Sequence, residues 1–299
     1  MKILKEKYPM GSFKGQKSDG RYIDETLYSN IKILAEKAKD DMTFLIFFFS
    51  STLEVGTGKS VFASQVADAW TYAVNEHLGT NIPFDINNCV FKPKDLIDRA
   101  FKVPKYSAIV LDEWEDSHYW SELGITLRQF FRKCRQLNLL IICIIPNFFQ
   151  LPLGYAISRS VAAIDVKFGN GFERGYFDFY NFNQKKELYI KGKKFHNYSA
   201  ASPSFQGVFA NGYAYDEVEY RKAKYKDMVE SDEEDKRPTE KQIRAKLFKQ
   251  LYQNLEGITV KKLSEAFGVS DRTGSRYLSS EKDEDEGTAQ PTEDSGVTI

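Results

Sequence analysis

Apolar runs of strand length alternate with stretches of helical periodicity in the first half of the chain. The predicted helices span 24–39, 60–79 and 125–138, and the predicted strands span 42–49, 108–111 and 139–145. The strands are apolar at consecutive positions, which is typical of parallel strands that helices cover on both faces. The pattern therefore predicts an α/β domain with a mainly parallel sheet.

Beyond Arg159 the pattern changes to short segments of alternating character, which predict strands. These strands span 162–168, 174–182 and 186–192, with a hairpin turn at Asn183 to Lys186. The stretch is rich in aromatic residues and lysines. Aromatic residues in strands usually pack in the core, but aromatics interleaved with lysines can also bind nucleic acid. Nucleic-acid contact is the alternative here.

A bundle of three short helices is predicted at 240–280. Residues 239–255 have the periodicity of one helix, and the following segment supplies two more, with Gly268 at the turn between them. Thr259 and Ser270 are expected to cap the second and third helices. The expected core residues are Val260, Leu263, Ala266, Phe267, Val269 and Leu278.

Three helices with this spacing are typical of a helix-turn-helix, whose third helix enters the major groove of DNA. The residues that this helix would present to DNA are Arg272, Thr273, Ser275 and Arg276. Gly274 lowers the helix propensity of the same segment. A protein-interaction module has the same apolar spacing, but the basic residues favour DNA.

Charge and cysteine content say little about the partners of the chain or its compartment. Lys+Arg and Asp+Glu both number 42, so attraction to nucleic acid must come from local clusters. Cys89, Cys134 and Cys143 lack the spacing of a metal or redox motif and are expected to be buried thiols in a reducing compartment. No apolar stretch is long enough to span a membrane, and we expect a cytoplasmic protein.

The segment "SSTLEVGTGKS" at 50–60 stands between a predicted strand and a predicted helix. This context predicts a phosphate-binding loop for ATP, formed by Gly56, Thr57, Gly58, Lys59, Ser60 and Val61. Lys59 would contact phosphate oxygens, and the hydroxyl of Ser60 would bind Mg²⁺. The motif normally has a glycine at the position of Leu53, so nucleotide binding depends on whether Leu53 can make the turn.

The strand at 108–111 ends in Asp112 and Glu113, as a Walker B motif requires. Asp112 is expected to hold Mg²⁺, and Glu113 to polarise the attacking water. The third strand ends at Pro146 and Asn147, and Asn147 is in the position of a γ-phosphate sensor. An asparagine that begins a turn is the alternative interpretation.

Arginines are candidates for a finger that stabilises charge on the phosphoryl group of a neighbouring subunit. Arg128, Arg132 and Arg135 are spaced to share one helical face, and Arg159 follows the third strand. We select Arg132 as the predicted catalytic finger, although exposed arginines are more often only solvated or ion-paired.

The motifs "GTGKS", "IVLDE" and "IICIIPN" resemble those of P-loop NTPases of the additional-strand class. Within this class the chain looks most like FtsK/HerA-type and zonula-occludens-toxin-like DNA pumps of mobile elements, although the pumps commonly have glutamine where Asn147 stands. The resemblance covers about residues 24–200 and implies ATP hydrolysis that drives motion. It also implies a homo-oligomeric ring, for which a hexamer is one candidate size.

The predicted organisation has five parts. They are an N-terminal extension at 1–23, a P-loop ATPase domain at 24–228 with a β-rich C-terminal part, an acidic linker at 229–239, a helix-turn-helix domain at 240–280 and a disordered acidic tail at 281–299. We expect residues 214–228 to form a charged, exposed helix.

Three functions fit these features. The first is an ATP-dependent DNA motor for translocation or packaging. The second is an AAA+ type loader or regulator on DNA, and the third is a DNA-binding protein with a nucleotide switch that does not hydrolyse ATP. Glu113 favours hydrolysis, and the C-terminal helices favour DNA, so the first is preferred.

Overall fold

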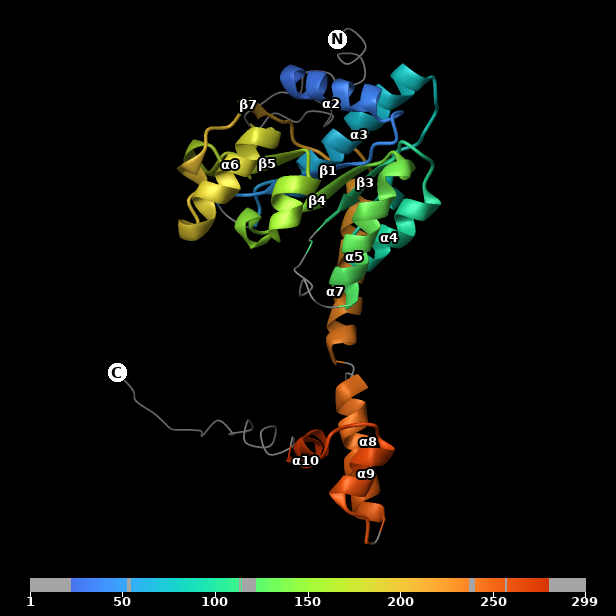
Figure 1. The fold of residues 1–299 in the computed structure, drawn as a ribbon. Helices are drawn as coiled ribbons and strands as arrows, with labels where there is room; N and C mark the ends of the chain where they lie inside the picture. The colour runs from blue at the N-terminus through green and yellow to red at the C-terminus, as the bar shows by residue number, and fades with distance from the viewer. Residues whose placement is uncertain are drawn as a thin grey trace, which may run out of the picture. The chain divides into compact units, whose positions relative to one another are not determined.

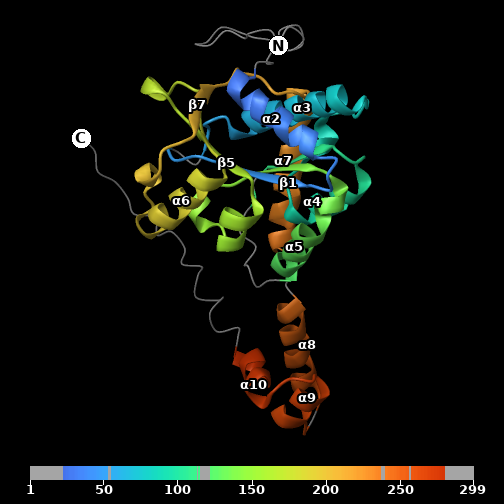
Figure 2. The ribbon, with the colours of Figure 1, turned by 45° about the horizontal axis from the view of Figure 1, so that its top comes forward.

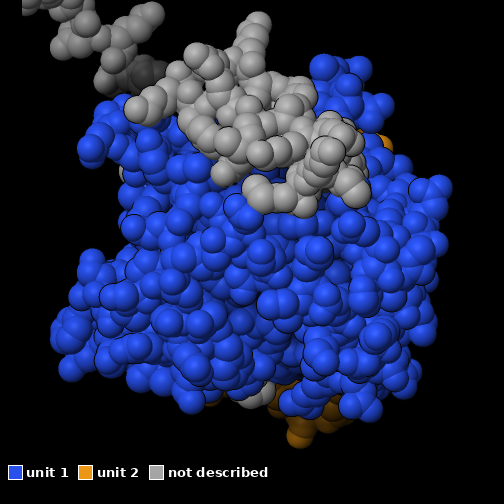
Figure 3. Space-filling model, turned by 90° about the horizontal axis from the view of Figure 1, so that it is seen from above, with its two compact units in different colours: residues 1–225 blue, residues 226–299 orange. Residues whose placement is uncertain are grey.

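The computed structural model describes residues 23–52, 55–112, 114, 122–236, 240–255 and 257–279. Most of the predicted N-terminal extension, the predicted acidic tail, Leu53 and Glu113 lie outside these ranges. The chain divides into two compact units, unit 1 (Met1–Tyr225) and unit 2 (Lys226–Ile299), which Figure 3 colours separately.

Unit 1 is built on a seven-stranded sheet with the order β2-β3-β4-β1-β5-β6-β7. The strands are β1 (Phe44–Phe49), β2 (Cys89–Val90), β3 (Ala108–Leu111), β4 (Leu140–Ile144), β5 (Ala162–Lys167), β6 (Tyr176–Tyr180) and β7 (Phe205–Val208). The pairs among β1 to β5 are parallel, whereas β6 and β7 extend the sheet in antiparallel fashion. Strand β4 lies between β1 and β3, and a mainly parallel sheet of this kind fits a P-loop NTPase core, as the sequence predicts.

Helices cover both faces of the sheet (Figures 1 and 2). Helices α2 (Glu25–Lys37) and α3 (Lys59–Leu78) contribute to one hydrophobic core, and α4 (Pro93–Lys102), α5 (Glu122–Lys133) and α6 (Phe182–Gly192) lie on the side of the other. The short helical turns are Ile86–Asn88, Cys134–Leu137, Phe148–Gln150, Asn170–Phe172, Lys193–Phe195 and Tyr198–Ala200, with a π-helical turn at Gly154–Arg159.

Strand β1 shows how the sequence produces these two layers. All six of its residues are buried, and successive side chains point to opposite faces of a strand. Phe44, Ile46 and Phe48 therefore enter the core that contains α2 and α3, while Leu45 and Phe47 enter the other core. The continuous apolar run is thus explained by burial on both sides.

The predicted strand at 186–192 is wrong, because these residues belong to helix α6. The side chain of Asn181 accepts hydrogen bonds from the backbone N–H groups of Asn183 and Gln184, which is an N-cap and not a hairpin turn. Leu188 and Tyr189 then pack into the core of unit 1, and β6 pairs with β7 instead. Most aromatic residues of this region are buried in the core, which is the interpretation that we preferred to nucleic-acid contact.

Residues 229–236 were expected to be part of a linker, but α7 (Glu217–Lys236) continues through them. This segment contains no glycine or proline, and its glutamates have good helix propensity, so the sequence does not break the helix here. The boundaries of the predicted domains otherwise stay a prediction.

Unit 2 contains three helices in the predicted order, α8 (Glu240–Asn254), α9 (Val260–Ala266) and α10 (Asp271–Ser279). The backbone N–H groups of Lys262 and Thr273 donate to the hydroxyls of Thr259 and Ser270, so both predicted caps are confirmed. The buried core consists of Phe248, Leu263 and Tyr277. Ala266, which we expected in this core, is exposed because the short helix turns it toward solvent.

Candidate nucleotide site

The segment predicted to bind phosphate lies in the chain between β1 and α3. Gly56 and Gly58 have φ angles of 84° and 96°, in the left-handed region that favours glycine. Gly58 is the N-cap residue of α3, a helix of 20 residues that begins at Lys59. The first N–H groups of a helix have no intrahelical acceptor, and the helix dipole makes this end positive. The loop can therefore receive an anion.

Ser60 and Asp112 meet at the carboxyl edge of the sheet. The hydroxyl of Ser60 donates to Oδ1 of Asp112 across 2.9 Å, although the two residues are 52 positions apart. Asp112 follows β3 and is only 1% exposed. A hydroxyl and a carboxylate are oxygen donors of the kind that Mg²⁺ prefers, usually with waters and substrate phosphates completing its shell. These two residues therefore fit the predicted metal role.

Helix α7 supplies two further groups to Asp112, which the sequence analysis missed. The hydroxyl of Tyr220 donates to Oδ2 of Asp112, and the ammonium of Lys224 lies 3.3 Å from the same oxygen. The segment was expected to be an exposed, charged helix, but Tyr220 is 3% exposed. The neighbouring aromatic residues Tyr213 and Tyr215 were the available signal that one face of this helix is buried.

Thr57 and Arg174 add polar groups to the loop itself. Thr57 is 1% exposed, and its hydroxyl has no hydrogen-bond partner among the described residues. Nη2 of Arg174 lies 3.7 Å from the position that a Cβ atom on Gly56 would take. An unpartnered hydroxyl and a nearby guanidinium fit phosphate oxygens. Arg174 stands far from the motif, so the sequence analysis missed it.

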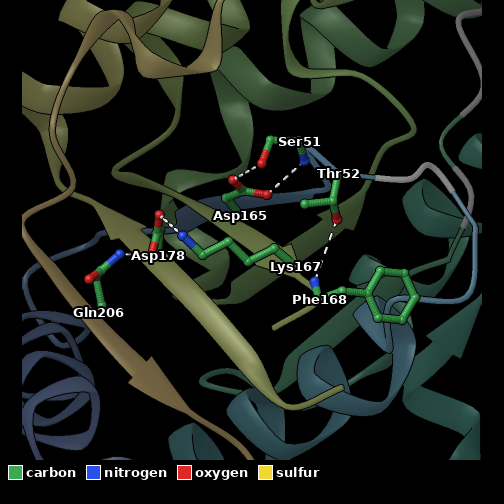
Figure 4. A network of polar contacts seen from close by, with 7 residues as sticks. All are labelled: Ser51, Thr52, Asp165, Lys167, Phe168, Asp178 and Gln206. Carbon is green, nitrogen blue, oxygen red and sulfur yellow. Dashed lines mark hydrogen bonds and ion pairs between the residues drawn. The ribbon is translucent and has the colours of Figure 1, made fainter. Parts of the chain in front are cut away.

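The start of the loop is held by a buried carboxylate (Figure 4). Asp165 on β5 accepts hydrogen bonds from Ser51, at 2.8 Å from its backbone N–H and also from its hydroxyl. Beside it, Lys167 forms an ion pair with Asp178, and Thr52 accepts a hydrogen bond from the backbone N–H of Phe168 across 3.5 Å. Side-chain contacts therefore fix the residues that precede Leu53, where the motif normally has a glycine.

Asp165 is 2% exposed, and this burial raises its pKa from the ordinary 3.8 to about 6. The charge of Asp178 adds to the rise, whereas the two hydrogen bonds from Ser51 and the charge of Lys167 oppose it. Ser51 thus donates both of its hydrogen bonds to a carboxylate that is costly to keep ionised. An acidic residue between the apolar residues Ile164 and Val166 was the available signal in the sequence.

Asp165→Asn is expected to flatten the pH dependence of stability. Asp165 binds its proton more strongly in the folded protein than in the unfolded chain, so its contribution is full below pH 3.8 and is lost as the pH rises through about 6. Between about pH 5 and about pH 8, the free energy of unfolding of the wild type should fall by about 1 kcal/mol relative to Asp165→Asn. The amide retains an acceptor for the backbone N–H of Ser51.

Urea unfolding at both pH values measures this difference. Asp40→Asn, which changes an exposed carboxylate, is the control and should follow the wild type. Equal pH dependence in wild type and Asp165→Asn would contradict the assignment.

Asn147 follows β4 but is engaged as a cap. Its Oδ1 accepts hydrogen bonds from the backbone N–H of Phe149 at 2.9 Å and from the hydroxyl of Tyr198 at 3.0 Å. Its side-chain oxygen therefore caps the turn Phe148–Gln150, in agreement with the alternative interpretation of an asparagine that begins a turn. Its role as a γ-phosphate sensor stays a prediction.

Arg132 lies in a pocket of about 250 Å³ together with Arg128 and Arg159. Arg135, which we expected on the same face, belongs to the following helical turn and does not line the pocket. The ammonium of Lys185 is buried and donates to the carbonyls of Ala156 and Ile157, in the π-helical turn that carries Arg159; burial lowers the pKa of Lys185 to about 8. None of the pocket's residues belongs to the phosphate-binding loop.

The residues predicted to contact DNA lie on α10. Arg272, Ser275 and Arg276 are exposed, whereas Thr273 is partly buried. The hydroxyls of Thr273 and Ser270 form a hydrogen bond. Gly274 faces inward, where a Cβ atom would lie 2.1 Å from Oγ of Ser264. Its absent side chain thus allows α9 and α10 to approach each other.

No family model matches the chain, and no curated protein matches it in sequence. A comparison of structures finds a likeness to the crystal structure of the DnaC helicase loader, with 18% identity and a TM-score of 0.26. It covers 48% of this chain and 80% of that one. Among the described residues, no helix has both the length and the apolar character needed to cross a membrane.

Proposed function

We propose that the chain is an ATP-hydrolysing P-loop enzyme that acts on DNA as a translocation or packaging motor. The observation that carries this proposal is the 2.9 Å contact between Ser60 and Asp112. It supports the ATPase part of the proposal, because Mg²⁺-dependent P-loop enzymes use the hydroxyl after the loop lysine together with an acidic residue at the end of a neighbouring strand.

Each residue of the site has a distinct role in this proposal. Lys59 and the loop N–H groups bind the phosphates, and Arg174 adds a second positive group from the same chain. Ser60 and Asp112 would hold Mg²⁺, and the ion would supply positive charge that offsets the negative charge of the phosphates. Glu113 orients and polarises the attacking water.

The arginine pocket supports a ring. Arg132 and Arg159 line a pocket that includes no residue of the predicted phosphate-binding loop, and in this proposal one of them acts on the nucleotide of a neighbouring copy. Lys185 would hold the turn that presents Arg159. A homo-oligomeric ring is the assembly in which every copy receives such a residue.

Unit 2 would bind DNA. Arg272, Ser275 and Arg276 form an exposed polar face on α10, on the side away from the inward-facing Gly274. Basic side chains on α8 and α9 would contact phosphates. Such contacts make binding weaker as the salt concentration rises, because each releases counterions.

The steady-state ATPase rate with and without single- and double-stranded DNA, at several salt concentrations, tests this function. Turnover should rise with long DNA, fall with salt and disappear in Glu113→Gln. The double variant Arg272→Ala, Arg276→Ala should retain the DNA-free rate but lose the stimulation. A motor should also displace a bound protein from DNA while it hydrolyses ATP.

The other outcomes separate the alternatives. ATP-dependent assembly on DNA without displacement would favour a loader. ATP and DNA binding without turnover in any condition would favour a switch, and the proposal of an ATPase would then be wrong.

A further inference from the structure

Both oxygens of the Asp112 carboxylate have partners from within unit 1. Oδ1 accepts from Ser60, while Oδ2 accepts from the hydroxyl of Tyr220 and lies 3.3 Å from the ammonium of Lys224. A carboxylate that is 1% exposed is strongly destabilising unless a positive charge or several hydrogen bonds compensate it. Lys224 therefore acts as a cation that the chain itself supplies to the Walker B residue.

The start of helix α7 is firmly placed against this site. Tyr220 and Lys224 are four residues apart, so they lie on one face of the helix. The ring of Tyr220 packs against Tyr213 and Tyr215, with ring centroids 4.5 and 5.6 Å away. Asp216 caps the first turn by accepting from the backbone N–H of Glu219.

Lys224 is placed differently from Tyr220. Its side chain is 37% exposed, whereas Tyr220 is 3% exposed. The ammonium can therefore move into water at little desolvation cost, since water already reaches part of the side chain. Tyr220 is neutral and fixed by packing, so it can keep its bond to Asp112 when the charge beside it changes.

We propose that Lys224 pairs with Asp112 in the nucleotide-free protein and leaves it when Mg²⁺ binds with ATP. The proposal rests on the nucleotide site described above. Asp112 cannot pair closely with Lys224 and also hold a divalent cation, because two cations at one carboxylate repel each other. Lys224 thus competes with the metal, and the affinity for Mg²⁺-ATP includes the free energy of breaking the ion pair.

Release of Lys224 would also loosen α7. The helix begins in unit 1 at Glu217 and continues past Tyr225, where unit 1 ends. The last turn of α7 within unit 1 would lose its ion pair with Asp112 each time nucleotide binds. Binding of nucleotide would in this way change the stability of α7, which precedes the predicted DNA-binding helices in the chain.

Lys224→Met tests the competition, with Lys222→Met as the matched control on an exposed position of the same helix. The readout is the dissociation constant of a fluorescent ATP analogue, with Mg²⁺ and with EDTA. Lys224→Met should bind the analogue about fivefold more tightly than the control with Mg²⁺, the value of a partly exposed ion pair near 1 kcal/mol. With EDTA it should bind no more tightly, since the metal is absent.

Hydrogen exchange of residues 217–228 provides a second readout. Mg²⁺-ATP should speed exchange in this segment of the wild type and of Lys222→Met, whereas Lys224→Met should exchange faster before nucleotide is added. Equal affinities of the two variants with Mg²⁺ would overturn the inference alone. Weaker binding by Lys224→Met would also overturn it, because Lys224 would then be a phosphate ligand. Failure of the wild type to bind ATP would overturn the nucleotide site and, with it, this inference.

Discussion

Lys59→Ala is expected to weaken binding of Mg²⁺-ATP about 100-fold, which is the usual scale for removing one member of a buried charge pair. Lys59 is the first residue of α3 and stands between Gly58, with its positive φ, and Ser60, which contacts Asp112. No other lysine belongs to the loop. The helix terminus and Arg174 would remain as positive groups, so binding should weaken strongly without vanishing.

Isothermal titration with ATP and Mg²⁺ measures this loss, and a thermal melt without nucleotide checks that the variant is folded. Lys102→Ala removes an exposed lysine at the end of α4 and serves as the matched control. It should bind ATP as the wild type does. If Lys59→Ala bound ATP with unchanged affinity, the loop would be an ordinary turn and helix start.

The elements of the candidate nucleotide site that depend on local sequence could be predicted. Glycines with positive φ at 56 and 58, the helix that follows and the acidic end of β3 are each encoded within a few residues. Parallel strands place their carboxyl ends at one edge of the sheet, so the meeting of Ser60 and Asp112 followed from the predicted topology.

The residues that the sequence did not reveal act across long separations. Asp165 holds Ser51 from 114 positions away, and Tyr220 reaches Asp112 from 108 positions away. Neither belongs to a motif, and the available signals are indirect: an acidic residue among apolar ones in β5, and the tyrosines Tyr213 and Tyr215 before a charged helix. Only the packing of β5 and α7 brings them to the site.

Helix α6 illustrates a different limit. Apolar and polar residues alternate over 186–192 in a way that matches a short strand. The N-cap at Asn181 and the burial of Leu188 and Tyr189 instead stabilise a helix. Short apolar segments of this length fit both periods, so local pattern alone could not separate them.

Gly274→Val is expected to unfold the helices of unit 2 while unit 1 stays folded. A Cβ atom at this position would lie 2.1 Å from Oγ of Ser264 and 2.9 Å from Cζ of Phe248, closer than any real contact. Rotation of the serine hydroxyl relieves only the first overlap, because the ring of Phe248 is fully buried at the centre of the helices. α10 would therefore have to move away from α8 and α9.

Such a small unit has little stability to lose. Among its described residues the buried apolar side chains are Phe248, Leu263 and Tyr277, with partly buried side chains packed around them. Overpacking of a core costs about 1–3 kcal/mol. Single cores of this size rarely supply more than about 3–5 kcal/mol. Hydrogen exchange of the full chain should therefore show lost protection across α8, α9 and α10, with the peptides of β1 and α3 as internal references.

Ser275→Val is the matched control, since it adds the same side chain at the next, exposed position of α10. It should keep wild-type protection, and protected helices in Gly274→Val would contradict the packing at this glycine. The same variant separates fold from function in the proposed motor. Gly274→Val leaves Arg272 and Arg276 in place, so a loss of DNA stimulation together with lost protection would mean that DNA recognises the folded arrangement of these arginines and not their charge alone.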